Sequence, residues 1–107
     1  MQAILDNPQI TIIRPNGCLD AKNAIKLERE LGAVLNQSSN TIVLIDLEKV
    51  DAIDSVGLMA LVSGVREALL LKQRLCFCSV APTHRIIFEL AGLDKVFEIF
   101  DTGHFNS

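Results

Sequence analysis

The feature that most constrains the fold of this chain is a run of consecutive apolar residues near its middle. In residues 41–47 the run Ile42-Val43-Leu44-Ile45 shows no alternation of apolar and polar side chains, which a strand with one wet face would require. Such a run is typical of a strand buried on both faces, as in the parallel part of a sheet. It therefore predicts an α/β domain, with helices packed on a sheet.

Turn and cap signals on either side of this run predict the remaining elements. The expected strands are residues 2–6, 9–14, 41–47, 74–80 and 96–100, and the first two pair as a hairpin around Asn7-Pro8. The expected helices are residues 21–35, residues 55 to about 71, and a third helix that Pro82 opens and Gly92 closes. This order, ββαβαβαβ, predicts a single α/β domain over residues 1–107 with a mixed β-sheet, a core at about residues 9–100 and a flexible tail at 101–107.

Charge and composition argue against several classes of protein. Ten Lys and Arg stand against thirteen Asp and Glu, a net charge of -3, and no long basic stripe is present, so nucleic acid is not an expected partner. No apolar stretch reaches about 18 residues, so no membrane span is expected. The N-terminus does not resemble a signal peptide, and three Cys is an odd number. Both observations favour a cytoplasmic protein with reduced thiols.

The second expected helix, which follows Asp54, carries the most information. At roughly 100° per residue, one apolar stripe should face the sheet. Its members are Leu58, Leu61, Val62, Val65 and Leu69. Val56 and Ala60 should point away from the sheet and Met59 should lie on a flank, so Val56 and Met59 should be partly exposed beside Ser55. Small apolar patches next to polar groups often mark interfaces, although isolated exposed apolar residues are also common.

The start of this helix has two interpretations. Asp54 or Ser55 could be its N-cap, because either side chain can accept from the free N–H groups of the first turn. Alternatively, a phosphate on Ser55 could be held at the helix N-terminus without unfolding the domain, with Asp54 and Asp20 opposing it as like charges. Asp20 is the expected N-cap of the first helix. Gly57 lowers the helix propensity of the first turn. Its presence there would be explained if another backbone or a nucleotide-bearing partner approached the helix closely at this point.

Three motifs, in order over about residues 9–100, resemble one family. Residues 52–58, Ala-Ile-Asp-Ser-Val-Gly-Leu, are similar to the signature of the STAS domain of anti-sigma factor antagonists. Residues 13–20 resemble the Gly-x-Leu-Asp motif that precedes the first helix of that family, and residues 90–97 resemble the close of its last major helix. The resemblance supports the same fold class, a STAS-like α/β domain.

The resemblance also implies a regulator that binds a partner protein and is not an enzyme. Unphosphorylated, such a domain binds an anti-sigma factor or a similar switch kinase of the GHKL type. The kinase then phosphorylates the residue that matches Ser55 with its own ATP, binding weakens, and a separate phosphatase of the PP2C type resets the switch. No cofactor of this chain is expected. The expected partner-binding residues are Asp20, Asp54, Ser55, Val56, Gly57 and Met59.

The chain departs from the family pattern at three positions, one of which is Pro15, where many members continue the strand. Val56 stands where a second hydroxyl residue often follows the phosphoacceptor, so Ser55 would be the only acceptor in the motif. Met59 stands where the family often has Gly, which could alter the choice of partner. The alternative hypothesis is a STAS module of another assembly, such as a transporter or a signalling scaffold, in which Ser55 is only structural.

Enzymatic alternatives lack residues that they require. A serine hydrolase needs a base near its nucleophile, but there is no Gly-x-Ser-x-Gly elbow, and the two His lie at the start of the third helix (His84) and in the tail (His104). There is also no P-loop. A receiver domain would need an acidic pair after its first parallel strand, whereas Asp20 stands alone.

Two clusters could suggest metal sites. Cys76 and Cys78 share one face of a strand, a poor spacing for zinc, and are expected to fill core. An acidic cluster is expected to form a solvated rim with helix caps in preference to a Mg²⁺ site. Its members are Asp46, Glu48, Asp51 and Asp54.

Overall fold

The computed structural model describes residues 9–37 and 41–100 of the chain. The elements in chain order are β1 (Gln9–Ile13), β2 (Gly17–Leu19), α1 (Ala21–Leu35), β3 (Thr41–Asp46), β4 (Val50–Ile53), α2 (Ser55–Leu70), β5 (Arg74–Cys78), α3 (Pro82–Leu90) and β6 (Glu98–Phe100). The strand expected at residues 2–6, its hairpin with β1 and the tail at 101–107 lie outside the described residues.

The main sheet has four strands in the order β1-β3-β5-β6, and each of these described pairings is parallel. The antiparallel part of the expected mixed sheet would be the hairpin with residues 2–6, outside the described range. Val43 and Ile45 are fully buried in the main core, and Leu44, between them, is buried in a smaller cluster with Cys76 and Cys78. The prediction that this strand is buried on both faces is confirmed.

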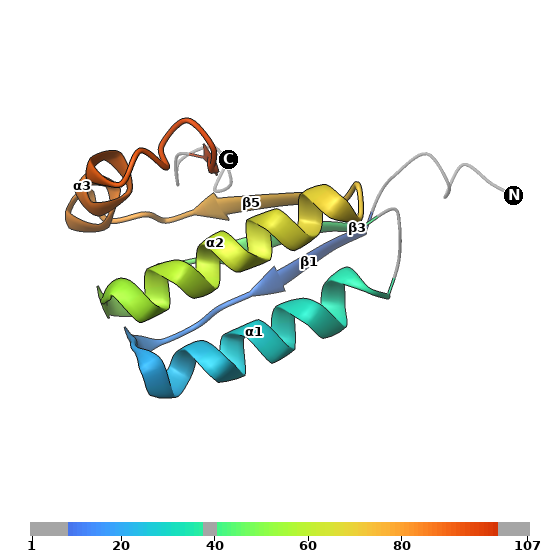
Figure 1. Cartoon of the computed structure of the whole chain (residues 1–107), viewed down its shortest axis with the longest axis horizontal. Helices are drawn as coiled ribbons and strands as arrows, with labels where there is room; N and C mark the ends of the chain where they lie inside the picture. Colours follow the sequence, from blue (N-terminus) through green and yellow to red (C-terminus); the bar gives the residue numbers. More distant parts are fainter. Residues whose placement is uncertain (1–8, 38–40, 101–107) are drawn as a thin grey trace, which may run out of the picture.

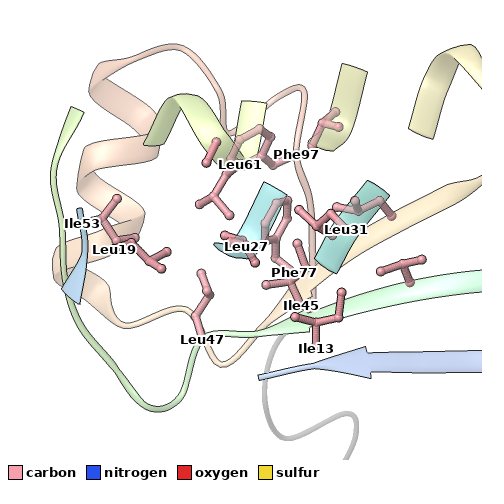
Figure 2. Packing of buried hydrophobic residues seen from close by; sticks show 14 of the residues in the cluster. Ile13, Leu19, Leu27, Leu31, Ile45, Leu47, Ile53, Leu61, Phe77 and Phe97 are labelled. Carbon is pink, nitrogen blue, oxygen red and sulfur yellow. The ribbon is translucent and has the colours of Figure 1, made fainter. Parts of the chain in front are cut away.

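Helices α1 and α2 lie side by side over the sheet (Figure 1). The core between the helices and the sheet is mainly aliphatic and includes the aromatic side chains of Phe77 and Phe97 (Figure 2). The labelled side chains include Ile13, Ile45 and Phe77 from the strands and Leu27, Leu31 and Leu61 from the helices. Phe97 stacks on Phe77 with ring centroids 4.6 Å apart, which fixes the segment before β6 against the sheet.

The ends of the helices follow local signals. α1 has the bounds that its periodicity predicts, Pro82 is the first residue of α3, and Gly92 follows its C-cap with φ +74°. β5 is shorter than expected because Ser79, with φ 57°, turns the chain after Cys78. No helix in the described part of the chain is long and apolar enough to cross a membrane.

A second, two-stranded sheet was not expected from the sequence. β2 and β4 pair in parallel, and Leu19 lies opposite Ile53. Figure 2 shows these two side chains together at one end of the core. β2 has three residues and β4 has four, too few for a clear period-2 pattern. This small sheet aligns the ends of two strands that lead into helices α1 and α2.

The buried face of α2 differs in part from the expected stripe. Leu61 and Val65 are buried as expected, but Leu69 is 69% exposed and Ala60 is only 1% exposed, so the expectation is wrong for these two residues. The reason is that α2 packs on α1 as well as on the sheet. Small residues allow this contact: a Cβ added at Gly64 would lie 2.8 Å from Leu31 Cδ1. A stripe predicted from the spacing of large apolar residues does not reveal such close helix contacts at glycine and alanine.

Candidate functional site

The small sheet brings two helix N-termini to one corner of the molecule. Because Leu19 and Ile53 are paired, β2 and β4 end at the same level, and α1 and α2 begin directly after them. The backbone N–H of Asp54 donates to the carbonyl oxygen of Leu19 at 3.1 Å. We call this region the α1/α2 corner, defined by Asp20, Asp54, Ser55, Val56, Gly57 and Met59. It unites the candidate residues of two separate motifs.

Both aspartates at the corner are helix N-caps. Asp20 Oδ1 accepts from the backbone N–H of Asn23 at 3.1 Å, and Asp54 Oδ1 accepts from that of Gly57 at 2.8 Å. The side chain of Asn23 donates to the carbonyl oxygen of Cys18 at 2.7 Å, which ties the first turn of α1 to β2. The structure thereby decides between the two possible caps of α2: the cap is Asp54, and Ser55 is the first helical residue.

Gly57 allows the first turn of α2 to pack directly against the end of β2. It is buried, and a Cβ added there would lie 2.0 Å from the carbonyl oxygen of Leu19. Real Cβ atoms essentially never approach a carbonyl oxygen so closely. The close backbone that the sequence led us to expect is therefore that of the chain itself, at the end of β2. Any other residue at position 57 would push α2 away from β2.

Ser55 is exposed, and its hydroxyl makes no hydrogen bond within the described part of the chain. Its neighbours Val56 and Met59 are 47% and 58% exposed, as expected. The corner therefore presents a hydroxyl with two apolar side chains next to it. The hydroxyl can be modified without breaking a hydrogen bond that supports α2, because Asp54 supplies the cap.

Among the described residues, no general base is hydrogen-bonded to the Ser55 hydroxyl. His84 lies in α3 with only 3% of its surface exposed, and its Nδ1 has no hydrogen-bond partner in the described structure. His104 lies outside the described residues.

The two clusters considered as metal sites have other roles. Burial raises the pKa of Cys76 to about 11 and also raises the pKa of Cys78, as expected for thiols that fill core. Asp46 pairs with Arg14 at 3.3 Å and accepts from the backbone N–H of Glu48. Residues 9–37 and 41–100 contain no group of three or more His, Cys, Asp or Glu side chains that could hold a metal ion.

Sequence reasoning missed two residues that build the corner. Leu19 supplies the carbonyl oxygen under Gly57 and accepts from Asp54, and Asn23 bonds to the strand before its helix. The signal for Asn23 was available, since it stands three residues after the cap Asp20. Nothing in the local sequence marks Leu19, because its role depends on a segment 35 or more residues away.

Comparison with known proteins points to one family. The model of the STAS domain family matches residues 3–105. BtrV of Bordetella bronchiseptica, whose name describes an anti-sigma factor antagonist, is 30% identical over 83 residues, which is 78% of this chain and 71% of BtrV.

Solved structures share the fold. SpoIIAA in its unphosphorylated form matches with a TM-score of 0.74 and 22% identity, over 90% of this chain and 82% of that one. The phosphorylated form of SpoIIAA, from Bacillus, matches with a TM-score of 0.70, 22% identity and coverage of 90% and 85%. A sulfate transporter family protein from Wolinella succinogenes matches with a TM-score of 0.69 and 18% identity, over 85% of this chain and 75% of that one. At these identities the likeness concerns the fold alone.

Proposed function

Since this chain belongs to the STAS domain family, we propose that it is a cytoplasmic anti-sigma factor antagonist that acts by binding and not by catalysis. BtrV, its 30% identical relative, bears that description by name. The observation that carries the proposal is the free, exposed hydroxyl of Ser55 at the α1/α2 corner, next to exposed Val56 and Met59. In the proposed function this corner binds an anti-sigma factor when Ser55 is unmodified.

Phosphorylation of Ser55 is the proposed switch. A phosphate would add a charge of about -1.5 to -2. The carboxylate of Asp54 already accepts from Gly57 N–H, so the new charge would stand beside an existing one at the surface. A partner that covers Val56 and Met59 would have to desolvate both charges, which opposes binding.

The proposed partner is a kinase of the GHKL type that supplies both the docking surface and the ATP. A phosphatase of the PP2C type would restore the hydroxyl. SpoIIAA, which shares the fold, has been solved in an unphosphorylated and in a phosphorylated form. The presence of the same fold in both supports a switch that changes a surface without unfolding the domain.

The test is phosphorylation by the cognate kinase with ATP, followed by intact mass measurement. Wild type should gain one phosphate and Ser55→Ala none, while Ser63→Ala, an exposed serine on the same helix, should be labelled like wild type. Ser55→Asp should weaken binding at least about tenfold, or about 1.4 kcal/mol, and Ser55→Ala should bind whether or not ATP is present. Labelling of Ser55→Ala to the wild-type level would refute the switch.

A second candidate function keeps the fold and changes the assembly. The structural likeness to the Wolinella succinogenes sulfate transporter family protein motivates it. In that case the corner would bind its partner permanently and Ser55 would stay unmodified. A pull-down separates the two: a GHKL kinase in the captured fraction favours the first function, and transport subunits with unmodified Ser55 favour the second.

A further inference from the structure

The second half of α2 carries an exposed apolar surface that the proposed switch does not use. Val62 and Leu69, two turns apart on α2, line the same groove, and Leu69 is 69% exposed. Val96, 56% exposed, lies across this groove of about 230 Å³ from them, in the segment before β6. We call this feature the α2 groove. The residues that line it include Val62, Arg66, Leu69, Leu93 and Val96.

An apolar groove at this place is unusual for a helix that covers a sheet. Such a helix normally presents polar side chains to solvent. The inner face of α2 already makes its contacts with α1 and the sheet through small residues and two larger ones, Leu61 and Val65. Leu69 therefore adds little to the core of the described residues, and its exposed side chain is available to an apolar surface of a partner.

The groove is separate from the α1/α2 corner. Leu69 follows Ser55 by 14 residues, which places it about 21 Å farther along the helix axis. A ligand in the groove need not touch Ser55. The inference is therefore independent of the proposed switch.

Arg66 decides which kind of partner fits. It is the one charged side chain that lines the groove, and it makes no ion pair or hydrogen bond within the described residues. A second copy docked symmetrically on the groove would bring two Arg66 side chains together, which like-charge repulsion opposes. A partner with a carboxylate opposite Arg66 would complement the charge instead.

The shape of the groove also restricts the partner. It follows α2 over the two turns from Val62 to Leu69, about 10 Å, and its far wall is the apolar pair Leu93 and Val96. An amphipathic helix laid along such a groove presents apolar residues three, four or seven positions apart to both walls.

We propose that the α2 groove binds an amphipathic helix of another protein, with apolar residues that contact Val62, Leu69 and Val96 and an Asp or Glu that pairs with Arg66. The α2 groove binds this helix whether or not Ser55 is phosphorylated. It gives the domain a second partner surface, so that one protein can remain docked while the switch changes the other contact.

Site-directed photo-crosslinking in the cell tests the proposal. p-Benzoylphenylalanine replaces Leu69 in the groove or, as a control, Ile25, which is 56% exposed on α1. Position 69 should give a specific crosslink and position 25 should not. Peptide sequencing should place the crosslink in an amphipathic segment that contains Asp or Glu. Arg66→Glu should lower the yield at least about tenfold, whereas Ser55→Asp should leave it unchanged.

A synthetic peptide with the crosslinked sequence then isolates the charge pair. It should bind wild type more tightly than Arg66→Glu, and its Glu-to-Arg version should show the reverse preference. The proposal is overturned by a crosslink yield at position 69 no higher than at position 25, by crosslinks to a second copy of this chain, or by insensitivity to Arg66→Glu. Failure of the Ser55 switch would show as normal groove crosslinking without Ser55 labelling, so the two proposals fail separately.

Discussion

Gly57 is the most tightly constrained single residue at the α1/α2 corner. Replacement by Ala would place a Cβ 2.0 Å from the carbonyl oxygen of Leu19, so α2 or β2 would have to shift. We expect Gly57→Ala to lower the free energy of unfolding by about 1–3 kcal/mol, the typical range for an overpacked site. Urea denaturation, followed by circular dichroism, measures the change.

Gly32 in α1 is the matched control. A Cβ added there meets no atom within 4 Å, and the residue is helical. Gly32→Ala should therefore raise stability by about 0.5–1 kcal/mol, the usual gain for Ala in a helix. Equal urea midpoints for the two variants would show that α2 does not rest on Leu19 as described.

At the scale of the element, α2 depends on its cap. Asp54→Ala removes the acceptor for Gly57 N–H and should lower the free energy of unfolding by about 1 kcal/mol. Asp54→Asn keeps an acceptor and should stay close to wild type. Thermal unfolding compares the two, with exposed Asp51→Ala as the control for loss of a nearby charge. If Asn destabilises as much as Ala, the role of Asp54 is its charge and not its hydrogen bond.

The same pair of variants separates stability from binding. Both remove the negative charge beside Ser55, yet only Asp54→Ala loses the cap. Partner affinity that falls equally in both variants would assign Asp54 a direct electrostatic role in binding. Affinity that falls only in Asp54→Ala would make Asp54 a residue that positions Ser55.

At the scale of the whole molecule, β6 is joined to the sheet by an ion pair. Arg74 donates to Glu98 through two nitrogens, and this hydrogen bonding, the largest cause, lowers the pKa of the Glu98 carboxyl. A carboxyl with a lowered folded-state pKa stabilises the fold fully above its ordinary pKa of 4.5 and loses that contribution as pH falls through the lower value. Wild type should therefore lose stability below about pH 4.5 in part through Glu98.

Urea midpoints measured between pH 3 and 7 test this dependence. Glu98→Gln should show a smaller fall in the midpoint below about pH 4.5 than wild type, while Glu89→Gln, exposed on α3, should keep the wild-type slope. Identical slopes for all three proteins would mean that Glu98 contributes nothing to the acid sensitivity of the fold. Because Glu98 is partly exposed, high salt should reduce the difference.

Much of this fold could be predicted from local sequence. The bounds of α1, the position of Pro82 and the role of Gly92 depend on capping, φ preference and periodicity, which act within a few residues. The burial of β3 on both faces followed from its continuous apolar run. Asp20 and Asp54 were expected at helix starts for the same local reason, and both are N-caps.

The sequence by itself determined the three helices and the strands of the main sheet within residues 9–100, because helix caps, turns and apolar periodicity depend on neighbours in the chain. Its motif resembles the STAS signature, and that resemblance made Ser55 the candidate acceptor. Tertiary structure alone decided that β2 pairs with β4, that Gly57 rests on Leu19, and that Leu69 faces solvent while Ala60 is buried. These features depend on contacts between segments far apart in sequence, where a carbonyl oxygen or a missing Cβ matters more than hydropathy. The free hydroxyl of Ser55 has a local cause, because the neighbouring Asp54 accepts from Gly57 N–H as the cap of α2. The sequence offered both residues as caps, and only the structure decided between them.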